Sequence, residues 1–373
     1  MPTPQSISLP EADPLVHVLL ILAFLIHALF MNLVVGGTLI TVTTDAIGIA
    51  TARTHYRQLA TTLSQWLPSF LGIAVVVGIF PLVMIQILFG HVFTPTASLL
   101  GEFWMIAFVA AGFGFGGLYA YKHWRDSLAH RPAVQLGVGV LSAVMFLVVA
   151  LVFVLASVLL LNPDQWAGFH KKSLGAALSL PSLLPRYGHL MLAAIAGTGI
   201  FLVGYGLFLK WKGQGGEGEE PKDRYPTWVI RYGVAWTLTG ALPQIVVGPW
   251  LLLSLPSMVR GDLISGDSFG SLAFFIGLTT GLLSLVLLNA ALMVPHVHGL
   301  AVGGTLSLLV TVCLMVVVRH AVRLSWLSQH DQAIVLSKQD QWDLFIIVSL
   351  VLVLGLGFMV FMARAFKKRR MVL

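Results

Sequence analysis

Two histidines stand inside long apolar stretches of the chain, where an ionisable side chain is costly and therefore suggests a function. His27 lies in IHALFMNLVVGG and His189 in PRYGHLMLAAIAGTGIFLVG, and small residues follow each of them. A neutral imidazole with glycine and alanine beyond it leaves room for a flat ligand. Axial ligation of haem iron is the expected use of such a histidine in a helical bundle. The alternative is that both rings are structural residues, hydrogen-bonded in the core or at a helix start.

Two further histidines are the best placed to supply a second axial ligand. His91 ends the second apolar segment and His320 ends the eighth, and both map to the same side of the membrane as His189. Methionine is the other possible axial ligand, and the 12 methionines of the chain leave that choice open.

Three polar residues on the same side are candidates for a proton or quinol site. These are Glu102, Gln86 and Arg186. Glu102 opens the third apolar segment, where a carboxylate also stabilises a helix N-terminus. Capping is therefore as good an interpretation of Glu102 as proton transfer.

The composition places these residues in a membrane protein. Of 373 residues, 57% are hydrophobic and 10% are charged, with a mean hydropathy of +0.90, whereas soluble domains carry about 25% charged residues. The formal charge of +7 is confined to loops and the C-terminal tail, so we expect no nucleic-acid binding. The single cysteine, Cys313, excludes an intrachain disulfide, a multi-thiolate metal site and covalently attached haem.

Nine apolar segments predict an all-α polytopic fold, because runs of about 20 apolar residues span a bilayer as helices. We place the segments at residues 15–47, 67–93, 99–121, 133–161, 187–211, 227–256, 271–294, 299–319 and 341–364. A weak internal repeat, with a histidine and then glycines in segments one and five, divides them into two four-helix bundles and a ninth helix. The predicted parts are a first bundle at 1–161, an outer connection at 162–186, a second bundle at 187–319, and an outer loop, ninth helix and basic cytoplasmic tail at 320–373.

Lysine and arginine are in excess in the connections after segments one, three and five and in the C-terminal tail. The positive-inside rule then puts the N-terminus outside and the C-terminus in the cytoplasm. We expect a multi-pass protein of a bacterial inner membrane, surrounded by lipid, with His189 near the outer face.

Three motifs in order resemble a known family. IHALFMNLVVGG around His27, GIFPLVMIQILFGHVF at 78–93 and PRYGHLMLAAIAGTGIFLVG around His189 are similar to the first, second and fifth helices of subunit I of bd-type quinol oxidases. The resemblance implies that His27 matches a haem ligand of the first bundle. It also implies that His189 matches the ligand of a low-spin haem b beside the quinol site.

The chain departs from the pattern of that family at its carboxylates. Gln86 stands where the second-helix pattern has glutamate, and Glu102 alone is present where the third helix has further glutamates. The connection expected to help bind quinol, between segments six and seven, is short, and no methionine clearly matches the one in helix seven. The oxygen-reducing centre of the family is therefore not expected here.

These observations predict a haem b-binding subunit, with one or two haems, of a respiratory electron-transfer complex. It would move electrons between quinol and a c-type or multihaem cytochrome that docks with other subunits on the outer face. The alternatives are a haem-free anchor subunit of a redox complex, a bd-like terminal oxidase and a transporter. The near absence of charge within the apolar segments argues against a transporter.

Overall fold

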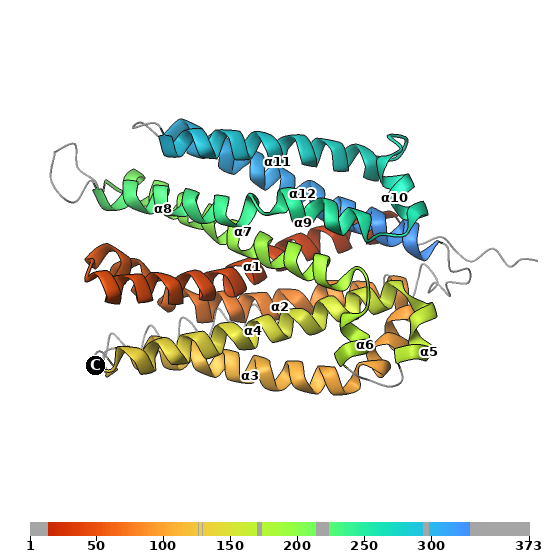
Figure 1. Ribbon diagram of the computed structural model, residues 1–373, viewed down its shortest axis with the longest axis horizontal. Helices are drawn as coiled ribbons and strands as arrows, with labels where there is room; N and C mark the ends of the chain where they lie inside the picture. Colours follow the sequence, from red (N-terminus) through yellow and green to blue (C-terminus); the bar gives the residue numbers. More distant parts are fainter. Residues whose placement is uncertain are drawn as a thin grey trace, which may run out of the picture.

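The prediction of an all-α polytopic membrane protein is confirmed by the computed structural model of the chain (Figure 1). The structure describes residues 14–125, 127–128, 130–169, 174–213, 224–293 and 298–328. Within these ranges, eight helical segments are long and apolar enough to cross a membrane. The predicted ninth segment, 341–364, lies outside the described residues.

The eight candidate spans are formed by nine helices, because one span is broken. They are α1 (Pro14–Thr51), α2 (Thr54–Leu99), α3 (Gly101–His123), α4 (Pro132–Leu161), α7 (Leu183–Trp211), α8 (Arg224–Ala241), α9 (Gln244–Leu253), α11 (Phe269–Met293) and α12 (His298–Leu327). Short helices lie in two connections: η1 (Pro163–Gln165), α5 (Trp166–Phe169) and α6 (Leu174–Leu178) follow α4, and α10 (Ser257–Ile264) follows α9.

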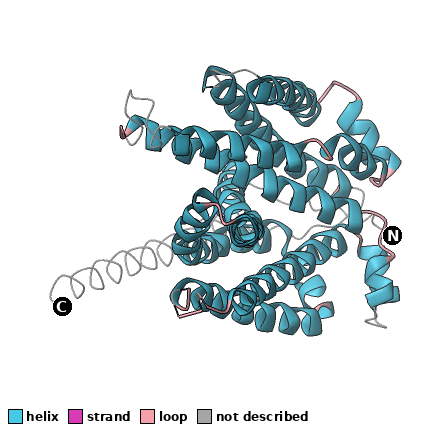
Figure 2. Ribbon diagram, turned by 60° about the vertical axis from the view of Figure 1, so that its left-hand side comes forward, coloured by secondary structure: helices cyan, strands magenta, loops and turns pink. Residues whose placement is uncertain are grey.

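Sequence neighbours pack against each other, and α1 joins the two halves of the chain. The closest pairs are α1 with α2, α3 with α4, α7 with α8, and α11 with α12, while α1 also packs along α7. Figure 1 shows the first four helices below and α7 to α12 above, and Figure 2 shows the same assembly turned. We call the end that carries α5, α6 and α10 the α10 end; α1 and α7 begin there, and α2 and α12 end there (Figure 1).

The division into two bundles at 1–161 and 187–319 stays a prediction, because the halves share a core. One hydrophobic cluster at the α10 end takes Leu20 from α1, Met84 from α2, Leu161 from α4, Val259 from α10 and Val318 from α12. The predicted outer connection, 162–186, contains the short helices and the first residues of α7.

Three predicted helix boundaries were wrong. The second span starts at Thr54 instead of residue 67 and has non-helical φ/ψ at Phe89. The sixth is broken between Ala241 and Gln244, where Pro243 cannot donate a backbone hydrogen bond. The eighth continues past residue 319 to Leu327, so the first residues of the predicted outer loop are helical.

Glycines let the central helices approach closely. A Cβ added at Gly36 of α1 would lie 2.5 Å from the carbonyl carbon of Ala194 in α7, and one at Gly199 would clash with the backbone nitrogen of Thr237 in α8. Such small-residue contacts are a main source of helix association in membranes, where no hydrophobic effect operates between helices. They fix α7, which carries His189, between α1 and α8.

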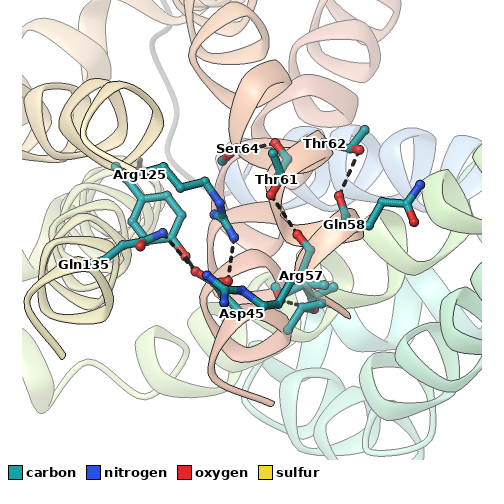
Figure 3. Close-up of polar contacts among 11 residues, drawn as sticks. Asp45, Arg57, Gln58, Thr61, Thr62, Ser64, Arg125 and Gln135 are labelled. Carbon is teal, nitrogen blue, oxygen red and sulfur yellow. Dashed lines mark hydrogen bonds and ion pairs between the residues drawn. The ribbon is translucent and has the colours of Figure 1, made fainter. Parts of the chain in front are cut away.

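A polar network secures the opposite end of the first four helices (Figure 3). The carboxylate of Asp45 is 0% exposed. It accepts hydrogen bonds from Tyr121 Oη at 2.6 Å, Arg125 Nη2 at 2.6 Å and Gln135 Nε2 at 3.1 Å. A buried carboxylate is tolerated when it is paired and hydrogen-bonded in this way. The network therefore ties α1 to α3, α4 and the turn between them.

Candidate functional site

His27 lies in α1 with one ring nitrogen fixed by the backbone of α2. Its Nδ1 is 3.0 Å from the carbonyl oxygen of Ala74. A carbonyl oxygen only accepts, so Nδ1 carries the proton and a neutral ring has its lone pair on Nε2. Metal-ligating histidines are commonly oriented by a hydrogen bond of this kind.

Gly78 makes room for the His27 ring. A Cβ added at Gly78 would lie 2.5 Å from His27 Cε1 and 2.7 Å from Nδ1, inside the 3.4 Å of ordinary contact. The imidazole therefore packs directly on the backbone of α2, one turn beyond the carbonyl that it binds.

His189 lies two turns into α7 and is held by the start of α9. Gln244 Nε2 donates to the backbone oxygen of His189 at 2.9 Å. His189 Nδ1 and Gln244 Oε1 are both buried without a hydrogen-bond partner among the described residues. If these two atoms paired, Nε2 would be left as the ligand atom. The helix break at Pro243 is what brings Gln244 to this position.

Three arginines gather beside the histidines at the α10 end. Arg323 of α12 is 7% exposed, and Arg319 of the same helix and Arg186 of α7 are partly buried. The guanidinium groups interact electrostatically with one another. Arg319 is near enough to His27, and Arg186 to His189, for their charges to disfavour a protonated imidazole. The cluster therefore lies near both predicted haem ligands.

Aromatic rings cover each of the three guanidinium groups. A planar guanidinium stacks well on such faces, which offsets part of the cost of burying it. The centroid distances are 4.0 Å from Arg319 Cζ to Phe24, 5.4 Å from Arg323 Cζ to Phe89 and 6.0 Å from Arg186 Cζ to Trp326.

No carboxylate neutralises the cluster within the described part of the chain. The single ion pair there joins Arg125 to Asp45, at the opposite end. Charges inside a membrane protein are costly unless paired, so three arginines without a carboxylate partner among the described residues favour a site for an anionic group.

His320 is engaged by another histidine. Its Nε2 lies 3.0 Å from Nδ1 of His17 in α1, and its Nδ1 is buried without a partner. His320 would have to leave His17, or use Nδ1, to become an axial ligand as predicted. The adjoining cavity of about 10 Å³, lined by Leu20 and Phe24 among others, is about the size of one water. A porphyrin would fit there only after these side chains move.

The structure does not bring the other predicted site residues into this cluster. Gln86 is exposed and donates to Thr94 Oγ1 at 3.1 Å. Glu102 is exposed in the first turn of α3. His91 follows the distortion at Phe89, and its buried Nδ1 has no hydrogen-bond partner among the described residues. Arg186 is the one member of the predicted proton or quinol site that lies in the cluster.

Sequence reasoning missed Arg319, Arg323 and the His17–His320 pair. The predicted eighth segment ended at Arg319, so Arg323 fell in the predicted outer loop and neither arginine was chosen as a site residue. Their four-residue spacing, which puts them on one helix face, and the apolar residues between them were the signal that the helix continued.

The side chains of this cluster suit a cofactor that already contains its metal ion. The described residues contain no group of three or more histidine, cysteine, aspartate or glutamate side chains able to hold a metal ion. Single imidazoles beside guanidinium groups match haem, which needs axial nitrogen ligands and carries two propionate carboxylates.

Comparison with known proteins supports the fold. No protein-family model matches the sequence, and no curated protein matches it either. A chain of the solved structure of the bd oxidase from Geobacillus thermodenitrificans is similar, with a TM-score of 0.75 over 95% of this chain and 98% of that chain at 13% sequence identity. The chain therefore has the fold of a bd oxidase chain.

Proposed function

We propose that the chain is a haem b-binding membrane subunit of a respiratory electron-transfer complex. The observation that carries the proposal is the arginine cluster, Arg186, Arg319 and Arg323, which lies beside His27 and His189 without a carboxylate among the described residues. The shared fold with a bd oxidase chain supports the respiratory assignment. Haem b, one or two per chain, would supply one-electron transfer when bound.

Different residues of the chain would bind the iron and the propionates of the cofactor. His27 would offer Nε2 while its Nδ1–H stays on the Ala74 carbonyl, and His189 would be oriented by Gln244. The guanidinium groups would pair with the propionates, and their aromatic neighbours would limit the entry of water. The electron source would be the quinone pool and the acceptor a c-type or multihaem cytochrome docked with other subunits at the α10 end.

We do not extend the proposal to oxygen reduction. Oxygen chemistry requires protons at the haem, and the described residues place no carboxylate in the cluster. Asp45, the fully buried acidic residue among those described, accepts hydrogen bonds from three donors at the opposite end. The position of the chain in a bacterial inner membrane, with its N-terminus outside, remains part of the proposal.

Pyridine haemochrome assay of the purified chain tests the proposal. We expect one or two haems b per chain, a loss of about one haem in H189A or H27A, and no loss in H123A. His123 is the control because it is exposed at the end of α3, away from the cluster. Added quinol should reduce the haem, and a folded protein without haem would refute the assignment.

A haem-free subunit of a redox complex is the second candidate. It is favoured by the packing of the His27 ring against Gly78 and by the small cavity beside His320. The arginine cluster would then receive an anionic group from another molecule. The haemochrome assay separates the two candidates, because only the first predicts stoichiometric haem in folded protein.

A further inference from the structure

A second feature of the chain lies at the opposite end, away from the histidines. A cavity of about 350 Å³ opens there beside the turn between α1 and α2 and the first residue of α4. Its volume is roughly ten times the share of one water in the liquid, about 30 Å³. Its walls are formed by Gly48, Ile49, Ala52, Thr54, Arg57 and Pro132.

The charge around the cavity is positive. Arg57 lines it, and the exposed side chains of Arg53 and Arg131 belong to the residues just before Thr54 and Pro132. None of these three guanidinium groups has an ion pair or side-chain hydrogen bond to any described residue. Asp45, the acidic residue described at this end, is occupied by the Arg125 network (Figure 3). The cavity therefore has cationic side chains that need an anionic partner.

Two long helices also begin at the cavity. Thr54 is the first residue of α2 and Pro132 the first of α4, and neither helix has a side-chain N-cap or an acidic residue in its first turn. The first backbone N–H groups of α2 lack intrahelical partners, whereas Pro132 of α4 has no N–H; at both helix starts the dipole favours an anion. These groups add to the attraction that Arg57 exerts on an anion.

The position of the cavity identifies the source of the anion. It lies where the apolar run of α1 stops near Ile49 and that of α4 begins at Pro132, so we expect it near the depth of the lipid headgroups. Ile49, Ala52 and Pro132 give it an apolar wall that suits the glycerol part of a lipid. Basic pockets between membrane helices are known sites for anionic headgroups. We propose that this cavity binds the phosphate group of an anionic phospholipid.

Lipid retention by the full chain in detergent tests the proposal. The purified protein is incubated with phosphatidylglycerol or phosphatidylcholine, and bound lipid is counted by native mass spectrometry. We expect preferential retention of phosphatidylglycerol, and about five-fold weaker retention in R57Q, since one arginine near a membrane surface is worth about that factor. K212Q is the control, because Lys212 is exposed after α7 and does not line the cavity.

A second variant, T54E, tests the proposal even if R57Q fails to fold. T54E places a carboxylate on the cavity wall, yet it should stabilise α2, because an acidic residue is favourable in the first turn. We expect T54E to fold normally and to lose phosphatidylglycerol. Equal retention of the two lipids, or retention unchanged in both R57Q and T54E, would overturn the proposal. Displacement of the lipid by millimolar inorganic phosphate would overturn the lipid assignment in favour of free phosphate.

Discussion

Replacement of Arg323 by methionine should change stability in opposite directions with and without haem. Arg323 is 7% exposed, its guanidinium has no carboxylate partner among the described residues, and its Cζ lies 5.4 Å from the centroid of the Phe89 ring. Replacing buried charged groups by apolar residues of similar size can stabilise a protein by about 1–4 kcal/mol. The lost cation–π contact offsets about 0.5–2 kcal/mol of this gain. We therefore expect haem-free R323M to be about 1 kcal/mol more stable than the wild type.

The haem-loaded form should respond in the other direction. A hydrogen bond to a charged group contributes about 1.5–3 kcal/mol, and R323M would lose that contact with a propionate. The net expectation is a loss of about 1 kcal/mol in the loaded protein. Thermal unfolding followed by tryptophan fluorescence, on protein made in haem-deficient and haem-replete cells, measures both values.

R260M is the matched control for R323M, because it removes an arginine at the same end of the protein that does not belong to the cluster. Arg260, also at the α10 end, already donates to the Leu253 carbonyl at 3.3 Å, so R260M should not reverse sign between the two forms. If R323M is destabilised equally with and without haem, Arg323 has a structural partner and the reasoning about an unpaired guanidinium is wrong.

Two stability predictions and one binding prediction follow from the packing. G199A should lower the free energy of unfolding by about 1–3 kcal/mol, because its new methyl group would meet the α8 backbone. G204A, whose new methyl group would have nothing within 4 Å, should not lower it. Equal melting temperatures of the two variants would contradict this. D45N should lower the free energy of unfolding by about 3–5 kcal/mol, because it leaves the buried guanidinium of Arg125 unpaired. D267N, at an exposed site, should leave it unchanged. A small loss in D45N would mean that the network is dispensable. G78A should displace the imidazole packed against it and lower haem content in the haemochrome assay; unchanged haem would exclude that ring as a ligand.

The sequence predicted the spans well where apolar residues run without interruption. Segments three, four and seven match α3, α4 and α11 to within a few residues. The all-α class follows from hydropathy alone, since a bilayer admits few other solutions, and eight of the nine predicted segments have a candidate span among the described residues.

Boundaries failed where tertiary packing overrides local polarity. The eighth segment was ended at Arg319, because charged residues lower the hydropathy of the next turn. In the structure, Phe24 and Phe89 from other helices cover the two arginines and allow α12 to continue. A residue-by-residue scale cannot register a ring supplied by a helix far away in the sequence.

The candidate site was predicted in part for the same reason. His27 and His189 could be chosen because an ionisable side chain is unusual within an apolar segment, and Arg186 because it directly precedes the fifth segment. The pairing of His17 with His320 joins residues 303 positions apart, and no local pattern reveals it. His91 and Gln86 were chosen by their place along the second segment, but the side-chain direction near the distortion at Phe89 decides what they contact.

The most direct test of the central claim is the dithionite-reduced minus oxidised spectrum of the purified full chain, recorded for the wild type and for H189A. We predict the bands of haem b in the wild type and a clear loss of their amplitude in the variant. A helical, monodisperse wild-type protein that shows no Soret band would contradict the claim that the arginine and histidine cluster holds haem.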